Sequence, residues 1–137
     1  MIRSNEATLN RPLGNRVIQA PEVFVSLADA NNILKSEKAW KENDRNGITL
    51  FKADELSVVL TALKKNAIIE NIKVSGFMTL QVLEGRITLM NNNSGRLVCA
   101  NEMLMFNPCV QYSVIADEES SILLTHYYTP GENRKIF

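Results

Sequence analysis

The sequence is poor in the side chains that usually bind transition metals. Its 137 residues include one histidine, His126, and two cysteines, Cys99 and Cys109, whose spacing fits no Cys-x-x-Cys pattern. Zinc and iron sites generally need several imidazole, thiolate or carboxylate ligands close together. A site built from several histidines of one chain is therefore excluded. We expect both cysteines to be reduced and half-buried.

An excess of charge of one sign and long apolar runs are also absent. Lys and Arg together number 15, as do Asp and Glu, and no dense run of basic residues occurs. Proteins that bind nucleic acids usually carry a basic patch or stripe, so neither a nucleic acid nor an anionic membrane is an expected partner. No segment is apolar enough to be a signal peptide or long enough to span a bilayer. We therefore predict a cytoplasmic location.

Residues that build a core are well represented. Hydrophobic residues make up 45% of the chain and charged residues 22%, which is typical of a globular protein. A chain of this length hides about two-thirds of its unfolded surface when it folds. The composition therefore predicts a compact core that needs no disulfide to hold it together.

The first third of the chain differs in pattern from the rest. Residues 1–20 are polar and include proline and glycine, which favours an extended arm. Ser26 followed by Asp29 indicates a helix N-terminus, since serine caps the first turn and aspartate favours its positive end. Apolar residues follow at helical spacing, namely Leu27, Ala30, Ile33, Leu34 and finally Trp40. We expect residues 1–47 to form an arm and one short helix that pack on a barrel or on a partner subunit.

Residues 48–137 have the pattern of an all-β domain. Apolar runs of four to eight residues alternate with turn residues, and Asn46-Gly47 is a strong turn signal before the first run. No connection is long enough to hold a crossover helix, so the strands are expected to pair antiparallel. This pattern predicts a sandwich or barrel. The expected strands are Ile48–Phe51, Ser57–Leu63, Ala67–Ile72, Phe77–Leu83, Arg86–Met90, Arg96–Cys99, Met103–Phe106, Gln111–Ile115 and Ser121–Tyr128.

Two stretches carry a more specific resemblance. The run Val-Leu-Glu-Gly that ends at Gly85 is similar to the commonest turn sequence of the cupin superfamily, and residues 101–116 resemble its second motif. Asn101 stands where that motif has glycine, and asparagine tolerates positive φ. The resemblance implies a double-stranded β-helix, the cupin jelly-roll barrel, and it covers residues 57–128.

The metal ligands of the superfamily are missing from this sequence. Counting along the motifs places the ligand positions on Asn71, Lys73, Met78 and Tyr112, while a shift of one residue would instead select Ile72 and Val74. Oxygenase-type cupins hold their metal with neutral imidazoles and a carboxylate, which these residues do not supply. We therefore expect a cupin without metal or other cofactor.

The interior face of the barrel contains the first candidate site residues. Met78, Leu80 and Val82 alternate along one strand and point inward if the resemblance holds, and so does Tyr112. Met78 either fills the core or forms a soft wall of a ligand pocket. The hydroxyl of Tyr112 needs a partner, which is either the protein itself or a ligand.

Three polar residues complete the candidate site. Asn71 and Lys73 are expected on one strand face near the barrel mouth, where Lys73 either reaches solvent or binds a carboxylate or phosphate, with Asn71 and Tyr112 orienting the ligand. His126 lies on the last strand. It is either a structural residue or a general base, because the pKa of imidazole is naturally near neutrality.

Three functions remain open from the sequence. The first is a small-molecule-binding cupin, for a small anionic or sugar-like compound. The second is a metal-independent isomerase, epimerase or lyase in which Tyr112 and His126 share proton transfers, so whether the chain is an enzyme stays undecided. The third is a structural or interaction protein whose barrel is filled by its own side chains. A cavity lined by Tyr112 and His126 would favour the enzyme, and a solidly packed interior would favour the third function.

The resemblance also implies an oligomeric state. Small cupins of a single domain commonly pair through their sheets and exchange terminal arms. We therefore expect a homodimer.

Overall fold

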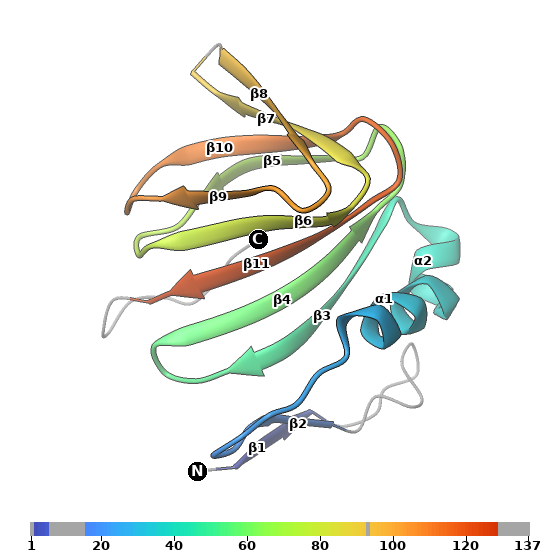
Figure 1. Ribbon diagram of the computed structural model, residues 1–137, viewed down its shortest axis with the longest axis vertical. Coiled ribbons are helices and arrows are strands. Elements are labelled where there is room, and N and C mark those ends of the chain that lie inside the picture. The colour runs from blue at the N-terminus through green and yellow to red at the C-terminus, as the bar shows by residue number, and fades with distance from the viewer. Residues whose placement is uncertain (1, 6–15, 93, 129–137) are drawn as a thin grey trace.

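Two antiparallel sheets face each other in the computed structural model, which describes residues 2–5, 16–92 and 94–128 (Figure 1). A separate two-stranded hairpin and two helices precede them in the chain. The elements are β1 (Arg3–Asn5), β2 (Arg16–Gln19), α1 (Leu27–Ser36), α2 (Lys38–Glu42), β3 (Arg45–Lys52), β4 (Leu56–Leu63), β5 (Ile68–Lys73), β6 (Met78–Glu84), β7 (Arg86–Asn91), β8 (Ser94–Cys99), β9 (Met103–Phe106), β10 (Gln111–Ala116) and β11 (Ser120–Tyr127).

The strand order is that of a jelly roll. One sheet has the order β3-β4-β11-β6-β9 and the other β5-β10-β7-β8, and all the pairings are antiparallel. Consecutive strands therefore cross repeatedly between the sheets, since β4 and β6 lie in one and β5 and β7 in the other. The prediction of an all-β jelly-roll barrel is confirmed.

Most residues with positive φ lie at turns between strands, whereas Asn71, with a φ of 55°, lies inside β5. Gly85 has a φ of +85°, and a Cβ there would lie 2.3 Å from both the Glu119 carbonyl oxygen and Ser120 Oγ, so only glycine fits. Asn66 and Asn101 also have positive φ, at 73° and 68°. The expected use of Asn101 in place of glycine is therefore confirmed.

The helical segment packs on the outer face of the larger sheet. The Ser26 side chain accepts a hydrogen bond of 3.3 Å from the Asp29 amide, which confirms the predicted cap. The segment divides at Glu37 into α1 and the shorter α2, which contains the buried Trp40. Leu34 of α1 joins a second apolar cluster, whose sheet members are Ile48, Leu50, Leu60 and Ala62.

The turn predicted at Asn46-Gly47 is wrong, because both residues lie inside β3. The Asn46 amide group donates to the Leu34 carbonyl oxygen (3.0 Å) and to Glu37 Oε1 (2.9 Å), so it joins the helical segment to the sheet. Gly47 pairs with Thr61 in the ladder between β3 and β4. Local turn propensity is thus overridden by partners that are distant in the sequence.

The N-terminal hairpin lies beside β3. β1 and β2 pair antiparallel, and the Arg16 guanidinium donates to the Thr49 carbonyl oxygen (2.8 Å). The middle of the predicted arm, residues 6–15, and the end of the predicted barrel, residues 129–137, lie outside the described residues. Within the part that is described, neither helix has the length and apolar run needed to cross a bilayer.

Candidate functional site

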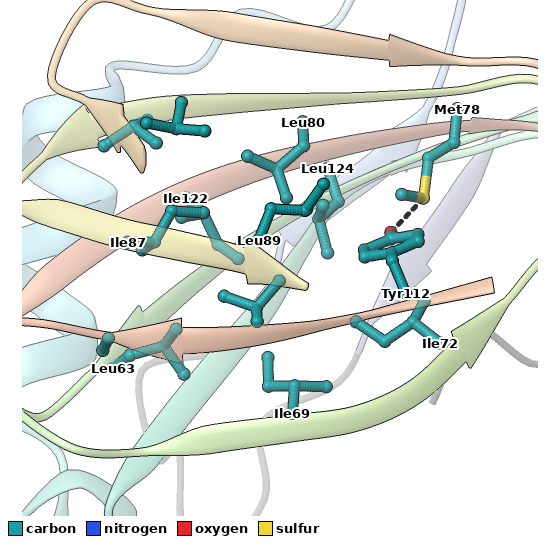
Figure 2. Close-up of a cluster of buried hydrophobic side chains, with 14 of the residues drawn as sticks. Leu63, Ile69, Ile72, Met78, Leu80, Ile87, Leu89, Tyr112, Ile122 and Leu124 are labelled. Atoms are coloured by element: carbon teal, nitrogen blue, oxygen red, sulfur yellow. Dashed lines mark hydrogen bonds between the residues drawn. The ribbon is translucent and has the colours of Figure 1, made fainter. Parts of the chain in front are cut away.

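Apolar side chains fill the space between the two sheets. Met78, Leu80 and Val82 of β6 are all 0% exposed and belong to the interior cluster. Figure 2 shows Met78 and Leu80 facing side chains of the opposite sheet such as Tyr112 and Leu89. A side chain with no accessible surface borders no space that could admit a water molecule, whether outside the protein or in an internal cavity. Other interior residues with 0% exposure come from both sheets and are Leu63, Ile87, Val114, Ala116, Ile122 and Leu124.

The hydroxyl of Tyr112 is hydrogen-bonded inside this core. From β10 it donates a hydrogen bond of 3.2 Å to Met78 Sδ across the barrel (Figure 2). Its ring stacks on Phe106, with the centroids 4.6 Å apart and the planes 5° from parallel. Burial raises the pKa of the Tyr112 phenol above its ordinary value, because the charged phenolate would be poorly solvated. The phenol therefore stays protonated at neutral pH.

His126 lies at the same end of the barrel as Tyr112. It is opposite Met78 on one side of β11 and opposite Ser57 on the other, and it is 2% exposed. Its ring is 4.1 Å from the Tyr128 ring, between centroids, at an angle of 57°. Met78 therefore touches Tyr112 through its sulfur and neighbours His126 across the sheet.

A buried pair beside His126 was not predicted from the sequence. Ser57 Oγ and the Tyr128 hydroxyl lie 3.0 Å apart in a hydrogen bond. Strand alternation does place Tyr128 on the same face as His126, but Ser57 reaches them only through the register of β4 with β11. The sequence therefore places Tyr128 on the face of His126 but gives no sign that Ser57 joins them.

Asn71 and Lys73 share one strand face as expected, but that face is the outer one, so the metal-ligand positions counted onto them do not face the barrel interior and Lys73 reaches solvent. Both are exposed, while Ile72 and Val74 are 3% and 4% exposed and face the core, as the alternative count with a shift of one residue requires. The side chain of Asn71 accepts instead from the Gln111 amide group on the outer surface (3.1 Å). Because side chains alternate with period two, an error of one residue in the count reverses every assignment on β5.

The cysteines also differ from the prediction. Cys99 is half-buried as expected, whereas Cys109 is exposed and has a φ of 67° in the turn before β10. Its backbone amide donates to the Val74 carbonyl oxygen (3.0 Å), which joins this turn to the end of β5.

The residues at this end of the barrel do not fit a cupin metal. The positions that would carry ligands hold Ile72, Val74, Met78 and Tyr112, whose side chains are two hydrocarbons, a thioether and a protonated phenol. In the described ranges no three His, Cys, Asp or Glu side chains gather closely enough to hold a metal ion. His126 could offer one nitrogen, which is too few for a stable site.

Two hollows lie outside the barrel, on either side of α1. One of about 310 Å³ is bordered by Asn31 of α1 and by Leu83 and Glu84 of β6. The other, of about 340 Å³, lies between α1, β2 and β3, with the exposed Phe24 and Ile33 at its rim. Neither contains a residue of the predicted site.

The Glu84 side of the first hollow is held by a polar network. The Lys35 ammonium group of α1 pairs with the Glu84 carboxylate and with Glu119 Oε2 (3.0 Å). Asn31 donates to Glu84 Oε1 (3.1 Å), and Ser121 donates to Asn31 (2.6 Å). These contacts fix α1 against the sheet, so the network is explained by helix attachment.

Comparison with known proteins identifies the fold. No family model matches the sequence, and no curated protein matches it. Among solved structures, a cupin superfamily protein from Desulfitobacterium hafniense is 11% identical with a TM-score of 0.61, covering 64% of this chain and 80% of its own. A cupin-2 domain containing protein from Shewanella frigidimarina is 13% identical with a TM-score of 0.59, covering 75% and 93%. KdgF from a Halomonas species is 10% identical with a TM-score of 0.57, covering 64% and 82%.

Proposed function

Since the chain has the cupin fold, we propose that it is a non-enzymatic cupin that works through its surface as an interaction protein. The observation that carries the proposal is the packed interior. Side chains with 0% exposure from both sheets occupy the place where a ligand would bind. Function is attached to sites rather than to folds, so the cupin fold alone implies no reaction.

The enzyme hypothesis receives less support from the geometry. General acid–base catalysis needs both groups within reach of one substrate in a common cavity. The Tyr112 hydroxyl donates a hydrogen bond to Met78 Sδ, and Met78, which is paired with His126 in the ladder between β6 and β11, is 0% exposed, so no open space borders it. The raised pKa of Tyr112 also opposes formation of the phenolate that a base would require.

The small-molecule-binding hypothesis loses its charged contact. Lys73 was the candidate for holding an anion, with solvent as the alternative, and it lies on the outer surface together with Asn71. A ligand inside the barrel would have to displace Tyr112 from Met78 and the stacked Phe106 ring. That displacement would expose apolar surface without a compensating ion pair.

Native mass spectrometry with elemental analysis tests this proposal. Freshly purified protein should have the mass of its polypeptide or of an integral multiple of it, and no transition metal should be present in stoichiometric amount. A Tyr112→Phe variant should give the same result, because the hydroxyl has an internal role. A stoichiometric organic acid, sugar or metal that is present in the natural protein and lost in the variant would refute the filled-barrel proposal.

The cellular compartment and the partners of the protein stay predictions. The cytoplasmic location is a proposal that cell fractionation would check. Nucleic acids and anionic membranes are not expected to bind, because the 15 basic and 15 acidic residues balance.

A further inference from the structure

The inner face of β8 opens to solvent at Arg96. The ladder partner of Arg96 on β7 is Leu89, which is 6% exposed and belongs to the core. Val98, two positions along β8, is 2% exposed and faces the same way. Alternation therefore points the Arg96 side chain toward the space between the sheets, although the residue is exposed. The larger sheet thus leaves β8 uncovered at this position.

The facing edge of the larger sheet is β9, which carries no charge. Its residues, Met103–Phe106, also include no proline or glycine. Leu104 and Phe106 pack toward the core, whereas Met103 and Met105 are 47% and 73% exposed. Edge strands usually carry charges, prolines or bulges that hinder pairing with another chain. An uncharged apolar edge is a ready template for strand addition, in which an extended segment of another chain joins the sheet.

Hydrogen bonding along β9 leaves a defined set of backbone groups open. The Val82 amide of β6 donates to the carbonyl oxygen of Glu102, the residue before β9 (3.0 Å). Because antiparallel ladders alternate, every second residue from Glu102 bonds to β6, and the amide and carbonyl groups of Met103 and Met105 point to the open side. Within the described part of the chain, nothing bonds to these four groups. An added strand can bond to all of them.

The edges β8 and β9 border the same side of the barrel. They are consecutive strands at the ends of opposite sheets, and the short turn around Asn101 joins them. Figure 1 shows the start of β8 and the end of β9 on the same side of the molecule. A strand added to β9 would therefore lie beside the opening into which Arg96 projects. Facing sheets lie about 10 Å apart, so a carboxylate directed inward from the added strand can meet the guanidinium.

We propose that β9 binds an extended segment of a partner protein by strand addition, and that this segment carries an aspartate or glutamate directed toward Arg96. This rests on the proposed function, since it names the kind of partner that the surface of the filled barrel binds. Outward side chains of the added strand would lie beside Met103 and Met105, so apolar residues are expected there. The recognised pattern therefore has apolar residues at alternate positions and an acidic residue at an inward position next to them.

Arg96 supplies the selectivity among partners. Arginine and a carboxylate form paired, charge-assisted hydrogen bonds, which are stronger than bonds between neutral groups. A lysine or arginine at the same position of the added strand would instead face a like charge, which destabilises a strand pair. The backbone of β9 therefore provides the binding that any extended segment can use, and Arg96 favours the acidic ones.

Selection from a phage-displayed library of random linear peptides tests the proposal, with the purified full chain as the target. The selected peptides should share apolar residues at alternate positions and an acidic residue adjacent to them. Selection on an Arg96→Glu variant should replace the acidic residue by a basic one, because the charge that the peptide meets is reversed. Such an exchange links the preference to this one side chain.

Calorimetric titration of the best selected peptide, made synthetically, measures each contribution. Arg96→Glu should raise the dissociation constant by at least about tenfold, since a charge-assisted bond is replaced by repulsion. Arg86→Glu is the matched control, because Arg86 is an exposed arginine of the neighbouring strand whose next residue, Ile87, faces the core. It should leave the dissociation constant unchanged.

A backbone variant tests the strand addition separately from the charge. Met105→Pro removes an open amide and spares the bonds to β6, so it should also raise the dissociation constant by at least about tenfold. Far-ultraviolet circular dichroism of each variant checks that the fold is retained. Sedimentation velocity of the natural protein and of Met105→Pro shows whether a second copy occupies the edge.

Four results would overturn the proposal. These are a library that yields no common pattern, selected peptides without an acidic preference, an affinity that Arg86→Glu lowers as much as Arg96→Glu, and a dimeric natural protein that Met105→Pro makes monomeric. None of these experiments measures the barrel interior. Failure of the strand addition is therefore distinguishable from failure of the filled barrel, which mass spectrometry of bound molecules would reveal.

Discussion

Replacing Met78 with alanine measures how completely the barrel interior is packed. Met78 is 0% exposed, lies between two sheet neighbours and accepts the Tyr112 hydroxyl. Truncating a buried methionine costs about 2–5 kcal/mol, through lost burial and the cavity that remains. The Tyr112 hydroxyl would also lose its partner, and an unsatisfied buried donor costs about 1–3 kcal/mol.

We therefore expect Met78→Ala to lower the free energy of unfolding by about 3–5 kcal/mol, which is a large share of the stability of a typical domain. The loss corresponds to a fall in Tm of roughly 10–20 °C for a chain of this size. Urea-induced unfolding followed by tryptophan fluorescence and circular dichroism gives the free energy, and a thermal scan gives Tm. The single tryptophan, Trp40, is buried in α2 and so reports on the outer cluster independently.

Met105→Ala is the matched control, because the same side chain is removed from an exposed position on the neighbouring strand. It should change the free energy of unfolding by less than about 0.5 kcal/mol, measured at a concentration where both proteins are monomeric. Apolar cavities created in packed cores bind benzene or xenon. Met78→Ala should therefore be stabilised by benzene, while the natural protein should not respond.

A loss below about 1 kcal/mol for Met78→Ala, close to that of the control, would refute this reasoning. It would mean that the space around Met78 is already open or collapses without cost. Stabilisation of the natural protein by benzene would lead to the same conclusion. Either result would favour the small-molecule-binding hypothesis over the filled barrel.

Two further substitutions test other parts of the fold. Gly85→Ala should lower the free energy of unfolding in urea by more than about 2 kcal/mol, because its positive φ is strained for alanine and its Cβ would contact Glu119 and Ser120. Gly47→Ala is the control: the nearest atoms to its Cβ would be 3.5 Å away, so it should cost about 1 kcal/mol or less. Equal losses for the two variants would contradict the claim that only glycine fits at position 85. The hydrogen bond from Lys35 lowers the pKa of Glu84, so its contribution is present at neutral pH and is lost as the pH falls through the lowered pKa. Glu84→Gln should therefore lose less than about 1 kcal/mol near pH 7, because the pair is partly exposed, and the difference from the natural protein should vanish in acid. A difference that stays constant with pH would exclude the ion pair as its source.

Much of the secondary structure could be predicted because its signals are local. The predicted and observed bounds of β9 are identical, and those of β6 and β11 differ by one residue at each end. A short apolar run between turn residues needs no knowledge of its partner to form a strand. The Ser26 cap is recognisable for the same reason, since its bond to Asp29 closes within one turn.

The candidate site was predicted only in part. The inward orientation of Met78, Leu80 and Val82 follows from alternation within one strand. The assignment on β5 failed because the count along the motif was one residue off. Buried and exposed residues alternate without a break from Asn71 to Met78, so Ile72 and Val74 share the inward face with Met78. The bond from Tyr112 to Met78 joins residues 34 positions apart, so no local pattern signals it.

By itself the sequence determined most of the strands and turns of the barrel and that ligands for a multi-histidine metal site are absent. These properties depend on residue type and on neighbours within a few positions. Only the tertiary structure decided that Ile72 and not Asn71 faces the core, that Ser57 lies beside His126, and that β9 is an open edge. Each of these depends on register between strands distant in the chain, and in a sheet a shift of one residue exchanges the buried and exposed faces.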